Sequence, residues 1–194
     1  MILRLVEPPD TEPVTVGEVK AQSRVLGDHE DDLIQGKIQS WREQTETATQ
    51  RALLTQTWEL IADAFPDHRE PIRLHRPPVA SVDSVVYVDQ SGAEQTLETS
   101  DYMLVPSEPG LLYPAPGQRW PATQKENPMA VKVRFVSGYG GDAGDVPESL
   151  RDAVIIGAAT GYSHREDLIS GEAVAELGVI DSLWDKFRWD PGVG

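Results

Sequence analysis

Residues Ala130–Asp167 read AVKVRFVSGYGGDAGDVPESLRDAVIIGAATGYSHRED, and they predict a strand, a glycine-rich turn and a helix in succession. Apolar and cationic side chains alternate in VKVRFV, which is the pattern of a half-buried strand. The glycines between positions 138 and 144 favour a sharp turn. Pro147 and Glu148 then suit the first turn of a helix. The segment pairs no nucleophile with a base and has no metal-ligand spacing, so it indicates packing rather than catalysis.

The helix that follows this turn is predicted from Pro147 to about Arg165. A glycine inside a helix costs about 1 kcal/mol relative to alanine. We therefore expect another helix to approach closely at Gly157 and Gly161. One broad face of the predicted helix is made of small and apolar residues, namely Leu150, Ala153, Val154, Gly157, Ala158 and Gly161, with Tyr162 beyond.

Two further helices are predicted near the N-terminus. Thr15 and Glu18 have the spacing of a capping box, so the first helix begins there and runs to about Leu26, with Gly27 just past its end. The acidic residues of 28–32 favour the start of the second helix, which ends near Arg51. Its heptad-like stripe fits against another helix or another subunit and consists of Ile34, Ile38, Trp41, Thr45, Ala48 and Ala52.

Between Leu54 and Tyr139 the hydrophobic period changes to two, which predicts about seven short strands. They are residues 57–65, 72–75, 82–88, 94–98, 102–105, 110–113 and 130–136. The pattern as a whole predicts an α+β fold, in which a small antiparallel β domain is inserted into a helical unit of about three main helices, with an extended C-terminal tail. The expected parts are 1–53 (N-terminal helices), 54–139 (β insertion), 140–168 (third helix) and 169–194 (docking tail).

The composition narrows the possible functions. Hydrophobic residues make up 39% of the 194 residues, which indicates either surface completed by partners or a loop-rich protein. The formal charge of -15 disfavours gripping a phosphate backbone; it suits either solubility or a wall along which DNA slides without sticking. The lack of cysteine excludes disulfides, thiolate catalysis and cysteine zinc sites. We expect no membrane span, because no apolar run approaches about 20 residues, and no signal peptide.

Some patterns resemble reactive sites but have simpler explanations. The acids around His29 suit a helix start, and consecutive side chains on a helix do not converge on a metal. Asp142–Asp145 lacks the ligand alternation of a calcium loop, and the preceding glycines lack the Gly-Lys-Ser/Thr of a phosphate loop. His164 has no oriented partner or nucleophile. We therefore expect no catalytic residue, no metal and no cofactor.

The chain also resembles a known family, the head–tail connector (adaptor) proteins of long-tailed bacteriophages and gene transfer agents, of the type with a β insertion between helices. Its most specific pieces are Arg134-Phe135-x-x-Gly138-Tyr139-Gly140, Val146-Pro147-x-x-Leu150-x-x-Ala153, and Tyr162 with Arg165-Glu166. Other similar pieces are Asp31-Asp32-Leu33-Ile34, Arg51-Ala52-Leu53 with Thr55-Gln56, Pro78-Val79-x-Ser81-Val82, Tyr87-x-Asp89-x-x-Gly92, Tyr102 and Gly117-x-x-Trp120-Pro121. Together they cover about Val14 to Arg188.

The resemblance implies a structural virion protein without enzymatic activity. It implies a homo-oligomeric ring of twelve subunits in the virion neck, assembled in the host cytoplasm without membrane contact. Such a ring joins the portal protein to the next neck, stopper or tail protein and lets double-stranded DNA pass without specific binding. Candidate subunit and portal contacts are Ile34, Ile38, Trp41, Leu150, Val154, Gly157, Gly161, Leu183, Trp184, Phe187, Arg188 and Trp189. Candidate acidic residues of the channel wall are Asp28, Glu30, Asp31 and Asp32.

Several alternatives stay open. The aromatic tail docks on a neighbour or the portal, or folds back onto its own core. A monomeric glycan- or protein-binding module is an alternative function, with a groove lined by Tyr87, Tyr102, Tyr113 and Trp120. A hydrolase that uses paired carboxylates is another. The less acidic middle region carries cations that are either solvated strand ends or contacts to phosphate or an acidic partner, namely Arg69, Arg73, Arg76 and Arg119.

Overall fold

The structure is a computed structural model that describes residues 1–67, 69–163 and 171–188. The chain divides into two compact units. The β unit consists of Met1–Pro9 and Thr55–Tyr139, and the helical unit consists of Asp10–Leu54 and Gly140–Gly194. In both units, segments that lie far apart in the sequence therefore fold together.

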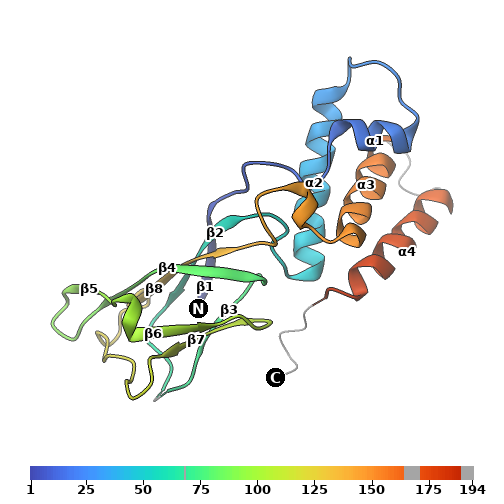
Figure 1. Cartoon of the computed structure of the whole chain (residues 1–194). Helices are drawn as coiled ribbons and strands as arrows, with labels where there is room; N and C mark the ends of the chain where they lie inside the picture. The colour runs from blue at the N-terminus through green and yellow to red at the C-terminus, as the bar shows by residue number, and fades with distance from the viewer. Residues whose placement is uncertain (68, 164–170, 189–194) are drawn as a thin grey trace. The chain divides into compact units, whose positions relative to one another are not determined.

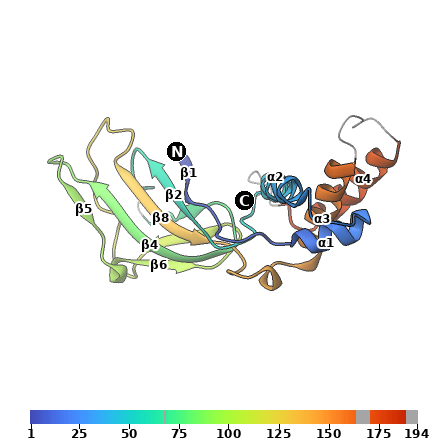
Figure 2. The same ribbon diagram turned by 90° about the horizontal axis from the view of Figure 1, so that it is seen from above.

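The β unit contains two antiparallel sheets (Figure 1). The strand order of the larger sheet, β1-β2-β8-β4-β5, can be followed across Figure 2. Its strands are β1 (Ile2–Glu7), β2 (Gln56–Ala62), β8 (Val131–Ser137), β4 (Val79–Val88) and β5 (Glu94–Thr96). The smaller sheet, in the order β3-β7-β6, consists of β3 (Ile72–Leu74), β7 (Gly110–Pro114) and β6 (Tyr102–Val105), and a short 3-10 turn (Thr99–Asp101) precedes β6.

Both sheets contribute to one apolar core, and the period-two pattern decides which side chains enter it. In β8 the residues Val131, Val133 and Phe135 are buried, as the alternation predicts. On the other face of the large sheet, Glu59 of β2 is buried under two guanidinium groups. Arg4 donates to one of its oxygens at 2.6 Å and Arg134 to the other at 3.2 Å. These ion pairs explain how a carboxylate is accommodated there.

The helical unit contains α1 (Val16–Ser23), α2 (Asp31–Thr49), α3 (Glu148–Ser163), α4 (Gly171–Asp185) and a 3-10 turn, Ala143–Asp145. The predicted capping box is confirmed: the Thr15 amide donates to the Glu18 carboxylate at 2.7 Å, and the Glu18 amide donates to Thr15 Oγ1 at 3.2 Å. The predicted end of α1 is wrong. The helix stops at Ser23 because Arg24 adopts a left-handed φ of 55° and its amide closes the last turn. Gly27 lies later in the loop.

The predicted α+β fold with antiparallel strands is confirmed. Two elements differ from expectation. Residues 2–7, which we grouped with the N-terminal helices, form strand β1 and pair with β2. The tail that we expected to be extended contains helix α4, because its apolar residues recur every three or four positions. Within the described part of the chain, no helix combines the length and hydrophobicity needed to cross a bilayer.

Candidate assembly interface

Most of the predicted contact residues on α2 and α3 pack against each other within this chain. Ile34, Ile38, Leu150 and Val154 are at most 1% exposed. Gly157 is also buried, and a Cβ built on it would overlap the ring of Trp41. A Cβ at Gly161 would come within 3.0 Å of Trp41 Nε1. The close helix approach at these glycines is thus confirmed, but it is internal, so these buried side chains present no surface to another subunit.

The described part of the tail, residues 171–188, folds back onto its own unit. Ile180 of α4 is 1% exposed, and Leu183 and Trp184 are half-buried. Arg51 at the end of α2 holds Phe187: its Nε donates to the Phe187 carbonyl at 2.7 Å, and its guanidinium lies 5.9 Å from the ring centroid. Figure 1 shows α4 beside α3. Residues 171–188 therefore follow the alternative in which the tail folds back onto its own core.

The end of the tail adds local ion pairs. Arg188 pairs with Asp181 at 3.1 Å and with Asp185 at 3.2 Å. Trp184 lines a shallow cavity of about 500 Å³ whose other walls are α2 residues, polar except for Ala48. Trp189 lies outside the described residues, so its predicted contact is not tested.

The acidic segment before α2 is largely tied into the helical unit. Lys20 of α1 donates to Asp28 and to Asp31, each at 2.7 Å. These hydrogen bonds raise the pKa of Lys20, and the same lysine lowers the pKa of Asp28. Glu30 accepts a hydrogen bond from the Tyr162 hydroxyl of α3. Among the four predicted channel residues, Asp32 is exposed and forms no ion pair in the described structure.

The apolar side chains that the helical unit does expose are ones that the sequence analysis did not select. Leu26 is 91% exposed in the loop after α1, and Leu33 is 40% exposed in the first turn of α2. On α4, Leu177 is 39% exposed and Val179 is 50% exposed. The signal for α4 was present in the sequence, since the run VAELGVIDSLW has more apolar residues than one buried helix face can hold. These residues are the available candidates for subunit contact.

A polar network fixes the segment that leads into α1. Arg42 of α2 is 5% exposed and donates to Glu12 at 2.8 Å and to Glu46 at 3.2 Å. Arg151 of α3 donates to the Pro13 carbonyl at 3.0 Å and also pairs with Glu18. The network therefore joins the incoming chain to α1, α2 and α3.

The aromatic residues of the β unit belong mainly to its core. Trp120 stacks on Phe65 with ring centroids 4.9 Å apart, and its indole N–H donates to the Glu70 carbonyl at 2.9 Å. Tyr87 and the same Phe65 ring form a T-shaped pair with centroids 5.6 Å apart. Tyr102 packs partly buried against the core. Three of the four aromatic residues predicted to line a groove therefore lie against the core, and Tyr113 of β7 is partly exposed.

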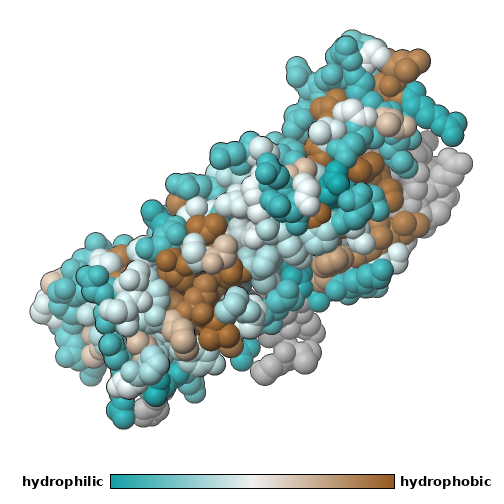
Figure 3. Space-filling model, viewed as in Figure 1, coloured by the Kyte–Doolittle hydropathy of each residue, from teal (hydrophilic) through white to brown (hydrophobic). Residues whose placement is uncertain are grey.

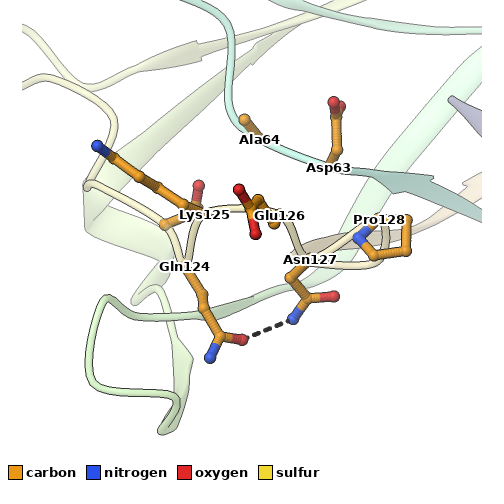
Figure 4. A pocket seen from close by; sticks show the side chains of 8 residues that line it. Asp63, Ala64, Gln124, Lys125, Glu126, Asn127 and Pro128 are labelled. Carbon is orange, nitrogen blue, oxygen red and sulfur yellow. Dashed lines mark hydrogen bonds between the residues drawn. The ribbon is translucent and has the colours of Figure 1, made fainter.

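One hollow in the β unit is lined mostly by residues with polar side chains. It has a volume of about 540 Å³ and lies between the end of β2 and the loop before β8 (Figure 4). Gln124 and Asn127 hydrogen-bond each other at 3.0 Å, and Lys125 points away from Asp63. Among the described residues, no group of three or more His, Asp or Glu side chains is placed to hold a metal ion. Other paired acids cap short turns, as Asp142 and Asp145 do.

Comparison with solved structures finds this fold over the whole chain. A chain in the neck of an empty GTA particle, computed with C6 symmetry, has a TM-score of 0.83 at 24% identity and covers 100% of this chain and 98% of its own. A chain in the virion of a native gene transfer agent (GTA) particle has a TM-score of 0.78 at 22% identity, with the same coverage. A chain in the neck of a native GTA particle, computed with C12 symmetry, has a TM-score of 0.74 at 23% identity, again with that coverage. No protein-family model and no curated protein matches the chain. The fold expected from the resemblance is thus confirmed.

Proposed function

We propose that the chain is a structural, non-enzymatic component of the neck of a phage-like or gene transfer agent particle. The observation that carries this proposal is the likeness to a GTA neck chain from end to end, with a TM-score of 0.83 and no large part of either chain left over. A shared fold alone does not fix function. Here, however, both units match together, and the helical unit leaves several apolar side chains exposed and available for contact with another subunit.

In this role identical copies of the chain form a ring, and we propose that the ring has twelve subunits. The related necks were computed with C6 and C12 symmetry, which supports a cyclic arrangement. A ring is closed by heterologous contacts, in which one surface of a subunit meets a different surface of the next. The ring joins the portal protein to the next neck, stopper or tail protein, and it is assembled in the host cytoplasm.

The charge of the helical unit supports its placement toward the DNA channel. The helical unit carries 9 Lys and Arg residues and 20 Asp and Glu residues, which gives a formal charge of -11. The β unit carries 8 Lys and Arg residues and 12 Asp and Glu residues, which gives a formal charge of -4. Net negative charge repels the phosphate backbone and lets double-stranded DNA pass without being gripped.

The test is assembly with the portal, observed by negative-stain imaging and mass photometry. Parent chain and portal together should give rings on the portal. Leu26→Asp and Val179→Asp should each lose ring formation, because they place a charge on an exposed apolar contact, while their melting temperatures stay at the parent value. Ser182→Asp, also exposed on α4, is the matched control and should assemble normally. Deleting the tail is a weaker test, because Ile180 is part of the core.

A monomer that ignores the portal at high concentration would contradict the proposal. So would normal ring formation by both aspartate variants. Binding of a glycan array by that monomer, abolished by substitution of Tyr113, would instead favour the alternative function as a binding module.

A further inference from the structure

The two sheets of the β unit differ in width, and one apolar hollow lies between them. The larger sheet has five strands and the smaller has three, with β3 at one edge. A cavity of about 310 Å³ opens there, walled by Leu60 and Ala62 of β2, Ile72 of β3, and Val131 and Val133 of β8, with Met1 at its rim. Figure 3 shows an apolar surface on the β unit, in the region where Figure 1 places the N-terminus and β3.

Strand β3 forms one side of this hollow and has a free edge. It pairs with β7 and with no other strand in the described structure. The edge of a sheet presents unpaired N–H and C=O groups that can receive another strand. Ile72 and Leu74 point into the core at 4% and 0% exposure, whereas Arg73 between them is exposed. In a strand added beside β3, successive side chains would likewise point alternately into the core and toward solvent.

The chemistry of that added strand follows from the neighbours it would meet. Residues beside Ile72 and Leu74 would point to the same inner face as those two side chains. The cavity lies beside Ile72 and has room for about two apolar side chains, since an apolar cavity of about 150 Å³ holds a benzene molecule. The residue between them would lie next to Arg73, for which the described structure records no ion pair. Arg73 and Arg76 both act on His75, whose pKa is lowered by burial first and then by these two charges. An acidic residue is therefore preferred beside Arg73.

We propose that the free edge of β3 is a docking site for an extended segment of another protein, with the pattern apolar–acidic–apolar. This mode is strand addition, in which the main chain supplies affinity and alternate side chains supply specificity. A second copy is disfavoured as the occupant, because two antiparallel β3 edges would bring Arg73 close to its own counterpart. Described segments of this chain with the required pattern are held elsewhere: Trp58-Glu59-Leu60 lies inside the large sheet, Ala62-Asp63-Ala64 begins at the end of β2, and Ala175-Glu176-Leu177 lies in helix α4. The proposal concerns the β unit alone and does not depend on the proposed function.

The experiment tethers a test strand to the full chain. Met1 lines the cavity, so a strand joined to the N-terminus through a linker of about ten Gly and Ser residues can reach β3 at an effective concentration in the millimolar range. The test strand is STVDVTS. The control STVVDTS has the same composition but places its two valines on opposite faces. The strand STVKVTS reverses the central charge.

The STVDVTS fusion should melt at least about 3 °C above the chain carrying the linker alone, and the β3 amides that do not bond to β7 should gain protection from hydrogen exchange. STVVDTS should give neither effect. Arg73→Glu, at an exposed position, should switch the preference to STVKVTS by about 2- to 5-fold in exchange protection. Ala64→Trp, at the exposed wall of the cavity, should fold normally and abolish the gain.

Equal responses to STVDVTS and STVVDTS would overturn the proposal, since the hollow would then be binding apolar groups without strand geometry. The absence of any stabilisation by STVDVTS would overturn it as well. An unchanged preference in Arg73→Glu would refute the assignment of the acidic position. Concentration-dependent pairing of the parent chain through β3 would assign the edge to a second copy and also overturn it.

Discussion

The contact between Gly157 of α3 and the Trp41 ring of α2 gives a sharp test of the helical unit. We compare Gly157→Ala with Gly36→Ala, because both glycines lie inside helices. A Cβ at Gly36 would meet no atom within 4 Å, whereas a Cβ at Gly157 would overlap the indole. Both substitutions gain helix propensity of about 1 kcal/mol. That gain cancels in the comparison, so the difference in stability isolates the overpacking at Trp41, about 1–3 kcal/mol.

The assay is urea unfolding followed by far-UV circular dichroism, with thermal melts beside it. Gly36→Ala should be more stable than the parent by up to about 1 kcal/mol, and Gly157→Ala should fall below Gly36→Ala by about 1–3 kcal/mol. In a Trp41→Leu background the smaller side chain relieves the overlap, so the penalty of Gly157→Ala should shrink or reverse. Equal stabilities of the two alanine variants in the parent background would refute the packing argument.

Three further predictions follow from polar contacts. Arg42→Ala leaves the carboxylates of Glu12 and Glu46 without their buried cation, and should cost about 3 kcal/mol in urea unfolding; the exposed Lys186→Ala should be near neutral. Thr15→Ala removes the capping box of α1 and should cost about 1 kcal/mol by the same assay; no loss would show that the cap is dispensable. The Ser91 hydroxyl first, and then Gln95 and backbone amides, hold the pKa of Asp89 at about 2 instead of 3.8. Its contribution is therefore complete above pH 3.8 and lost as the pH falls through about 2, so Asp89→Asn should melt below the parent at pH 5 and together with it near pH 2; an equal gap at both pH values would contradict this.

Local structure could be predicted from the sequence where one short pattern determines it. The alternation in VKVRFV predicted β8, and Thr15 with Glu18 predicted the start of α1. The small residues at Gly157 and Gly161 predicted a close helix approach, which Trp41 makes. These patterns succeed because the side chains involved lie within a turn or on one face of an element.

The sequence could not predict which apolar face meets a partner. Ile34 and Val154 have the spacing of an interface, but the same spacing serves an internal helix contact, and the structure assigns it there. Strand β1 was missed because the six-residue segment ILRLVE shows no clear period-two alternation by itself, and it is defined by its pairing with β2. Leu26 was missed because a single exposed residue in a loop makes no periodic pattern. The deciding information in each case lies in distant parts of the chain.

In the proposed ring, the ion pairs of the acidic segment would change how the negative charge of the helical unit acts on DNA. Lys20 neutralises part of the field of Asp28 and Asp31, so this segment is a weaker source of repulsion than its composition suggests. Screening in physiological salt limits each remaining charge to about 8 Å. Repulsion along a proposed channel therefore depends on carboxylates without a cationic neighbour, such as Asp32, repeated in every subunit. Substituting Asp32 by Asn should then slow DNA passage or increase DNA retention more than Asp28→Asn does, although the two changes remove the same formal charge. A larger effect of Asp28→Asn would show that the loop conformation held by Lys20, and not the local field, governs passage.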